Sequence, residues 1–164
     1  MTAPATTTDP ETRLDRDDHE ALRLWLRLFT CTTMIERVVD STLRRDFAST
    51  LPRFDLLAQL FRSPDGLRMG ELSARILTTG GNVTSLVAAL EREGLVKRRP
   101  APDDGRATLV RLTAAGRRHF TTMARAHERL IAGLFDGLSA TERRALHAAL
   151  GTLKQRFRPS RDTR

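Results

Sequence analysis

The sequence predicts a mainly α-helical fold that carries one small β-hairpin wing. Apolar residues return at three- and four-residue steps over long segments near both ends of the chain, which is typical of amphipathic helices. Between these segments, two short helical stretches surround a turn, and two strand-like stretches flank an Asp-Gly dipeptide. This order predicts two short helices and a hairpin, with long helices before and after them.

The first long helix is expected over residues 20–43. Proline disfavours helix at the residue before it but suits the first turn of a helix, so we expect a break at Leu51-Pro52 and a second helix over residues 54–61. The Ser-Pro-Asp-Gly segment at residues 63–66 is a turn that ends this second helix. The first helix has an apolar stripe, which consists of Leu22, Trp25, Leu26, Phe29, Ile35, Val38, Val39 and Leu43.

Two short helices are expected over residues 69–77 and 82–93. The Thr-Thr-Gly-Gly segment at residues 78–81 separates them, because threonines favour helix caps and glycines favour turns. Gly94 is well placed to end the second helix in the left-handed conformation. The inward face of that helix is expected to contain Val83, Leu86, Val87 and Leu90.

A hairpin and two helices complete the predicted order. The strands are expected at residues 95–99 and 108–112, joined by a long polar tip at residues 100–106. A long helix begins at Thr113 and runs to about residue 135. The Ser139-Ala-Thr-Glu142 segment is a capping box, so it predicts a last helix that runs to about residue 157.

The charge of the chain indicates a polyanionic partner. Lysine and arginine number 28 against 20 aspartate and glutamate residues, a formal net charge of +8. Such a surplus favours nucleic acid or an anionic membrane surface. Residues 92–118 contain eight basic and three acidic residues, so much of the positive charge lies on and around the predicted hairpin. A membrane-surface role is less favoured, because a hairpin is not an amphipathic helix with a basic face.

Other classes of protein are excluded by what the sequence lacks. No apolar stretch approaches the ~20 residues of a membrane span, and the N-terminus does not resemble a secretory signal, which predicts a cytoplasmic protein. One cysteine and four scattered histidines predict no disulfide, no metal site and no cofactor. No phosphate-binding loop or nucleophile-base-acid motif is present, so we do not expect an enzyme.

The length of 164 residues suits one good core better than two. We expect one winged helix-turn-helix domain over residues 13–158, between disordered tails at residues 1–12 and 159–164. Within it, a DNA-binding module spans about residues 54–113. Dimerisation helices span about residues 18–45 and 114–157.

A helix-turn-helix followed by a basic hairpin is suited to place one helix in a major groove and the hairpin on the adjacent backbone or minor groove. The small Gly81 allows the backbone to approach phosphates, and Asn82, Thr84 and Ser85 offer short donors and acceptors to bases or phosphates. The alternative is a capped helix start that binds nothing, because these residue types favour caps in any case.

The hairpin supplies further candidate contacts. Arg106 lies beside Asp104 near the tip, where its guanidinium can enter a narrow minor groove. The alternative is a surface Asp-Arg pair that contributes at most ~1 kcal/mol, and both readings hold if Asp104 orients Arg106. Strand alternation places Lys97 and Arg99 on one face as phosphate contacts, and Arg98 on the other.

The order and spacing of four motifs resemble the MarR family of bacterial transcriptional regulators. The motifs are Glu71-Leu-Ser73, Thr79-Gly-Gly-Asn-Val-Thr84, Leu90-Glu-Arg-Glu-Gly-Leu-Val96, and Asp104-Gly-Arg106 through Leu112-Thr-Ala-Ala-Gly116. The resemblance implies that residues 82–93 are the recognition helix, that Arg106 is the wing arginine and that Asp104 orients it. It also implies a homodimer on palindromic double-stranded DNA, often a repressor that a small ligand or oxidation releases.

The apolar stripes make the homodimer plausible independently, because they exceed what one small winged domain can cover. An entirely intrachain helical core is the alternative. An effector is a further hypothesis: Trp25, Phe29, Phe54 and Met34 are candidates to line a crevice for a small aromatic or anionic ligand, although such stripes are more often plain core.

Two other functions stay open as alternatives. Cys31 lies in the first helix, where some relatives sense oxidants, but a buried and inert cysteine is favoured because its neighbours carry no charge that would activate the thiol and the chain has no tyrosine. The winged fold can also serve as a protein-interaction module without specific DNA binding. The placement of the basic residues argues against that second alternative.

Overall fold

The computed structural model describes residues 19–76, 82–101 and 104–157, and for residues 104–106 it describes the backbone alone. The predicted tails at residues 1–12 and 159–164 lie outside the described residues. The chain divides into two compact units, the first ending at Met123 and the second beginning at Ala124. The single domain expected over residues 13–158 stays a prediction.

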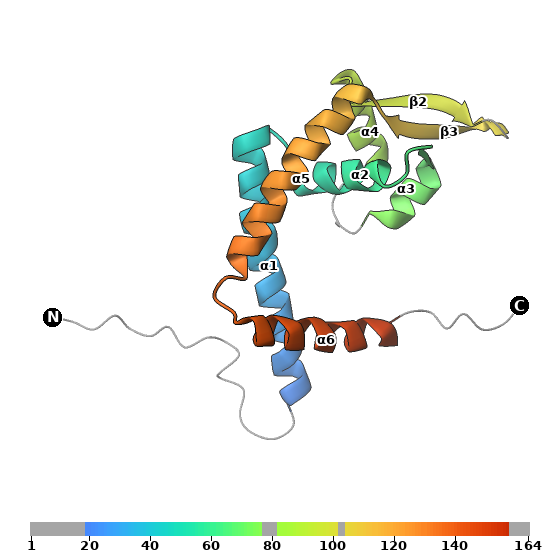
Figure 1. Cartoon of the computed structure of the whole chain (residues 1–164). Helices are drawn as coiled ribbons and strands as arrows, with labels where there is room; N and C mark the ends of the chain where they lie inside the picture. The colour runs from blue at the N-terminus through green and yellow to red at the C-terminus, as the bar shows by residue number, and fades with distance from the viewer. Residues whose placement is uncertain (1–18, 77–81, 102–103, 158–164) are drawn as a thin grey trace, which may run out of the picture. The chain divides into compact units, whose positions relative to one another are not determined.

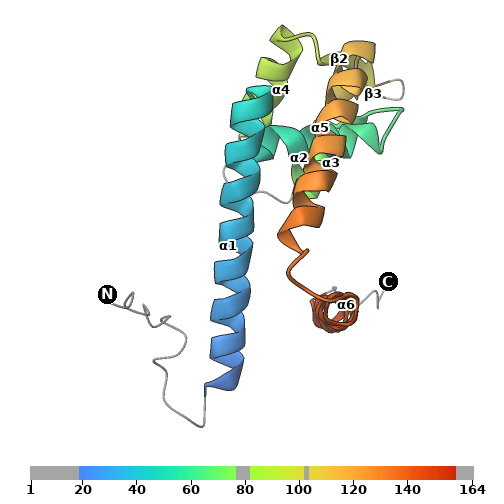
Figure 2. The same cartoon turned by 60° about the vertical axis from the view of Figure 1, so that its left-hand side comes forward.

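Helix α1 (Glu20–Phe47) is one continuous helix, as Figure 2 shows, and it is four residues longer than predicted. The apolar stripe ends at Leu43, but Arg44 and Arg45 continue the helix and suit the negative end of its dipole. The helix ends at Ala48, a non-glycine residue in the left-handed conformation with φ of 49°. The amide of Ser49 then donates to the Leu43 carbonyl oxygen at 3.1 Å, which completes the cap.

Helix α2 (Leu51–Phe61) begins three residues before the predicted start at Phe54. The predicted break between the two helices is present, because α1 ends at Phe47 and α2 begins at Leu51. Pro52 lies in the first turn of α2, where its missing N–H would have had no partner in any case. Thr50 is the N-cap, and its hydroxyl oxygen accepts a hydrogen bond from the Arg53 amide at 3.4 Å.

Asp40 joins α1 to the start of α2. One carboxylate oxygen accepts a hydrogen bond from the Leu51 amide at 2.8 Å, and the other accepts one from Arg44 Nε at 2.6 Å. Partial burial acts to raise the pKa of Asp40, but the hydrogen bonds from Leu51 and Arg44 outweigh it and hold the pKa below its ordinary value. Asp40 therefore caps a helix that begins eleven residues further along the chain.

We expect Asp40→Ala to lower the free energy of unfolding by about 1 kcal/mol at neutral pH, because the first N–H of α2 loses its acceptor. A carboxylate with a lowered pKa stabilises the fold above its unfolded pKa of about 3.9, and this stabilisation is lost as the pH falls through the folded pKa. The difference between native and variant, measured by urea unfolding, should shrink below about pH 4. Asp46→Ala is the matched control, because the exposed Asp46 contacts its neighbour Arg45. An equal and pH-independent loss in both variants would contradict this role.

The winged module has its core beneath two short helices, α3 (Met69–Arg75) and α4 (Val83–Arg92). Helix α3 is shorter than predicted, because Ile76 is already extended with ψ of 123°, and the predicted last residue Leu77 lies outside the described residues. The side chains that share the core are almost fully buried: Leu56, Leu57, Leu60, Leu72, Val87, Leu90, Val96, Val110 and Met123.

The sheet is antiparallel, with strand order β1-β3-β2. Strands β2 (Val96–Ala101) and β3 (Asp104–Leu112) form the predicted hairpin, but β3 begins four residues earlier than expected, inside the segment assigned to the tip. Strand β1 (Leu67–Arg68) was not predicted, and it pairs with β3. Figure 1 shows the outer part of the β2–β3 ribbon extending beyond α2, α3 and α4.

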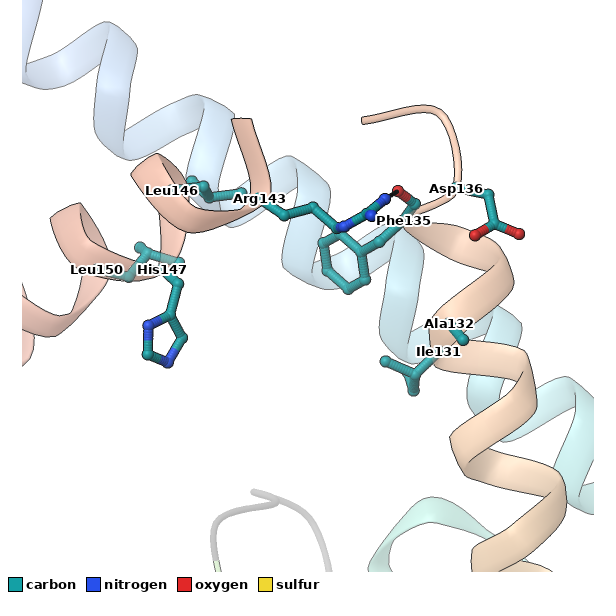
Figure 3. A pocket seen from close by; sticks show the side chains of 8 residues that line it. All are labelled: Ile131, Ala132, Phe135, Asp136, Arg143, Leu146, His147 and Leu150. Carbon is teal, nitrogen blue, oxygen red and sulfur yellow. Dashed lines mark hydrogen bonds between the residues drawn. The ribbon is translucent and has the colours of Figure 1, made fainter. Parts of the chain in front are cut away.

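Helices α5 (Ala114–Leu134) and α6 (Ala140–Arg156) follow the sheet. The predicted capping box is present, because the Ser139 amide donates to Glu142 Oε2 at 2.8 Å and the Glu142 amide donates to the Ser139 hydroxyl at 3.3 Å. The end of α5 and the start of α6 surround an open hollow of about 530 Å³ (Figure 3). Its lining residues are Ile131, Ala132, Phe135, Asp136, Arg143, Leu146, His147 and Leu150.

Candidate nucleic-acid interface

The first turn of α4 presents the polar residues that the sequence selects. Asn82 is the N-cap, and its Oδ1 accepts hydrogen bonds from the amides of Thr84 at 3.0 Å and Ser85 at 3.4 Å. Asn82, Thr84 and Ser85 are exposed and lie together, whereas Gly81 lies outside the described residues. Capping occupies the oxygen of Asn82, while within the described part of the chain its amide N–H groups have no hydrogen bond and belong, like the two hydroxyls, to exposed residues. The capping role and a binding role are therefore compatible.

The C-terminal end of α4 is held at three places. Gly94 has φ of +71°, and the Leu95 amide donates to the Leu90 carbonyl oxygen at 2.9 Å, so the predicted glycine cap is present. Glu93 forms an ion pair with Arg53 of α2, whose side chain is 19% exposed. Glu91 contacts Arg98 of β2. The Glu93 contact joins this end of α4 to α2, and the Glu91 contact joins it to the wing strand β2.

The basic residues of β2 divide between the two faces of the sheet, as alternation predicts. Arg98 is opposite the buried Val110, and it pairs with Glu91. Lys97 is opposite Arg111, and the exposed Arg99 is opposite Leu109, on the other face. Within the part of the chain that the structure describes, neither Lys97 nor Arg99 has an ion-pair partner. Their charges are thus available to an external anion.

The two wing residues of the sequence prediction lie in β3. Asp104 is paired with Ala101 after an irregularity in register between Pro100 and Ala101. Arg106 follows two residues later in the same strand. The side chains of both lie outside what the structure describes, so the orientation of Arg106 by Asp104 stays a prediction.

The Leu-Thr-Ala-Ala-Gly motif joins the start of α5 to the end of α4. The Thr113 hydroxyl donates to the Gly94 carbonyl oxygen at 2.6 Å, and the Gly116 amide donates to the Thr113 hydroxyl at 2.9 Å. The Thr113 amide donates to the Leu95 carbonyl oxygen at 3.0 Å. Sequence reasoning recognised this motif as a family signature but did not identify these contacts, which connect residues far apart in the chain.

The candidate ligand residues do not come together. Trp25 and Phe29 stack on each other with ring centroids 5.7 Å apart, and both are more than half exposed, as is Met34. Phe54 instead packs against Phe120 with ring centroids 5.4 Å apart. Because Phe54 lies one turn beyond Leu51, which Asp40 binds, it is roughly 20 Å along the α1 axis from Trp25. One small crevice within a single chain does not contain all three rings.

The prediction that Cys31 is buried is wrong. The structure places this cysteine on the exposed surface of α1, not in the core that a structural cysteine was expected to occupy. The expectation rested on the general burial of free cysteine, whereas this part of α1 has its apolar side chains uncovered within the chain. Among the described residues, no helix has the length and apolar character needed to cross a membrane.

Known structures share this architecture. The structure of a MarR family transcriptional regulator from Silicibacter pomeroyi has a TM-score of 0.76 at 30% sequence identity, and the match covers 87% of this chain and 100% of that one. The chain belongs to the MarR family. A sequence profile of the MarR family also matches residues 50–107, which contain α2, α3 and α4. Membership in the MarR family confirms the predicted winged helix-turn-helix fold, and it places the chain among transcriptional regulators and not enzymes.

Two further relatives bear on function. Sco3205, a MarR family transcriptional regulator from Streptomyces coelicolor, was solved in complex with DNA; it has a TM-score of 0.75 at 26% identity, with 90% of this chain and 93% of that chain covered. The uncharacterized HTH-type transcriptional regulator YdgJ of Bacillus subtilis is 33% identical over 102 residues, which is 62% of each protein. The chain thus matches less than two thirds of the length of YdgJ.

Proposed function

We propose that this MarR-family chain is a sequence-specific DNA-binding transcriptional regulator. The observation that carries the proposal is the exposed polar first turn of α4, together with a wing strand, joined to the other end of that helix, whose Lys97 and Arg99 have no ion-pair partner among the described residues. Asn82, Thr84 and Ser85 read base edges or phosphates in a major groove, and Lys97 and Arg99 bind the backbone. Arg106 enters the adjacent minor groove. Sco3205, with the same fold, was crystallised with DNA.

The proposed regulator acts as a homodimer on a roughly two-fold operator. Supporting this, α6 carries Leu146, Leu150 and Leu153 at helical spacing, each 37–40% exposed, and Phe157 beyond them is 77% exposed. The first unit likewise leaves Trp25 and Phe29 uncovered. Apolar side chains so arranged are typical of an obligate interface. A dimer would present two recognition helices to half-sites about one helical turn, or ~10 bp, apart.

The proposal is tested by electrophoretic mobility shift over a salt series, with a duplex that the native chain enriches from random-sequence DNA. Lys97→Ala and Arg99→Ala should each weaken binding to all sequences and reduce the slope of log affinity against log salt by about 1. Thr84→Val removes a hydroxyl from the first turn of α4, and it should relax specificity at a cost of about 1–3 kcal/mol.

Arg129→Ala is the matched control. It also removes one positive charge, but from the part of α5 that belongs to the second compact unit. Its salt slope should equal that of the native chain. If Lys97→Ala, Arg99→Ala and Arg129→Ala all reduced the salt slope by the same amount, the binding would reflect general attraction between the positive chain and DNA. Failure of the native chain to enrich any duplex would favour a protein-interaction module instead.

A further inference from the structure

The recognition helix and the wing are joined by a short connection. Between the end of α4 and the start of β2 lie Glu93, Gly94 and Leu95, and Gly94 has a positive φ. The outer part of the β2–β3 ribbon extends beyond the helices (Figure 1). Strand β3 is anchored by its pairing with β1 at Leu109 and Val110, whereas β2 is an edge strand, so a contact between α4 and β2 is needed to fix the wing strand relative to the recognition helix.

Glu91 supplies that contact with both of its carboxylate oxygens. Oε1 accepts a hydrogen bond from the Arg98 amide at 3.0 Å, and Oε2 lies 3.3 Å from Arg98 Nε. Strand β2 is an edge strand, so this amide on its outer side has no strand to pair with. One side chain of α4 therefore binds both the main chain and the side chain of the third residue of the wing strand.

We infer that Glu91 is a positioning residue, which fixes the angle between the recognition helix and the wing so that both reach DNA together. The inference rests on the proposed DNA-binding function. Glu91 is not itself suited to contact DNA, because it lies about 10 Å along the helix axis from Thr84 and carries the same sign of charge as phosphate. Its neighbour in the pair, Arg98, is on the opposite face of the wing from Lys97 and Arg99.

The negative charge of Glu91 and its contact with the wing predict opposite changes in DNA affinity when the side chain is removed. Removing a carboxylate near a polyanion favours DNA binding through charge alone. Loosening the wing weakens binding to a specific site, because Arg99 and Arg106 no longer reach their contacts together with the first turn of α4. The side chains of the pair are 35% and 39% exposed, so the pair contributes little to global stability and a folding defect is not expected.

Glu93 provides a matched control on the same helix end. It is also a carboxylate paired with an arginine, but its partner Arg53 lies on α2 and not on the wing. With the duplex enriched by the native chain, we expect Glu91→Ala to lower affinity about tenfold, while Glu93→Ala lowers it much less or raises it. Glu91→Gln keeps an oxygen that accepts from the Arg98 amide, and it should recover part of the affinity. On a scrambled duplex of equal length, none of these variants should bind more weakly than the native chain.

A double-mutant cycle with Arg106→Ala separates an effect of Glu91 on the position of the wing from a general loosening of the protein. If Glu91 acts by placing the wing, Glu91→Ala should cost clearly less once Arg106 is absent, because only the contact of Arg99 then remains to be lost. Fully additive losses, or equal behaviour of the Glu91 and Glu93 variants, would overturn the inference while leaving the proposed function intact. If the native chain enriched no duplex at all, the proposed function would fail and this inference with it.

Discussion

Gly116→Ala is expected to lower the free energy of unfolding by about 3 kcal/mol or more, because the space for a Cβ atom is already filled by backbone. A Cβ at this position would lie 1.9 Å from the Leu95 carbonyl oxygen and 2.8 Å from its carbonyl carbon. The same oxygen accepts a hydrogen bond from the Thr113 amide at 3.0 Å, and the Thr113 hydroxyl donates to the neighbouring Gly94 carbonyl oxygen at 2.6 Å. Any retreat of Leu95 would therefore stretch the hydrogen bonds that join α5 to the end of α4.

The control for this substitution is Gly70→Ala. Gly70 also lies in the first turn of a helix, but nothing lies within 4 Å of a Cβ built there. Alanine favours helix over glycine, so Gly70→Ala should leave stability unchanged or raise it by up to ~1 kcal/mol. Both variants are compared by urea unfolding at one protein concentration, since association changes apparent stability. A Gly116→Ala protein as stable as the native chain would mean that α5 moves away from Leu95 without cost.

The elements that the sequence predicts well are those fixed by local patterns. The capping box at Ser139, the glycine cap at Gly94 and the alternation of Lys97, Arg98 and Arg99 each depend on residues within one turn or strand. The structure has the two caps in place and puts Arg98 on the face opposite Lys97 and Arg99. Helices and hairpin could be ordered from these signals because each is independent of distant residues.

The errors arise where distant residues decide the local structure. The predicted start of α2 is three residues too late, because nothing near Leu51 in the sequence shows that Asp40, eleven residues before it, caps a helix there. Strand β1 has two residues, too few for any periodicity, and it exists through its pairing with β3. Cys31 is exposed because no other part of the described chain packs over that stretch of α1. The residue pattern of α1 alone does not reveal this.

In the candidate site too, the sequence predicts the residues that local spacing determines and misses the one that a contact between two elements determines. The polar first turn of α4 and the exposed face of β2 follow from spacing, so the sequence identifies Asn82, Thr84, Ser85, Lys97 and Arg99. Glu91 was missed, because its contact with Arg98 depends on the angle at which the chain turns at Gly94. The seven-residue separation of an acid and a base across a glycine cap is a signal that could have found it.

Leu150→Glu is expected to dissociate the proposed homodimer and to weaken operator binding at least about a hundredfold. Leu150 is 40% exposed in the chain and lies between Leu146 and Leu153 on one face of α6. If a second copy covers this face, the substitution buries a carboxylate without a partner in each of the two subunits, at a cost of several kcal/mol. A monomer holds one recognition helix, so it also loses the second half-site, and the two losses act on the same binding equilibrium.

Ala148→Glu separates this effect from the added charge. Ala148 is exposed on the opposite face of α6, and its replacement by glutamate changes the net charge of the chain by the same amount. Sedimentation equilibrium should show a dimer for the native chain and for Ala148→Glu, and a monomer for Leu150→Glu at the same concentration. A native chain that sediments as a monomer would refute the interface, and a dimeric Leu150→Glu chain would place it elsewhere than on this face of α6. Because operator affinity in this scheme requires two recognition helices, a monomer that bound its operator as tightly as the native chain would contradict the two-fold operator itself.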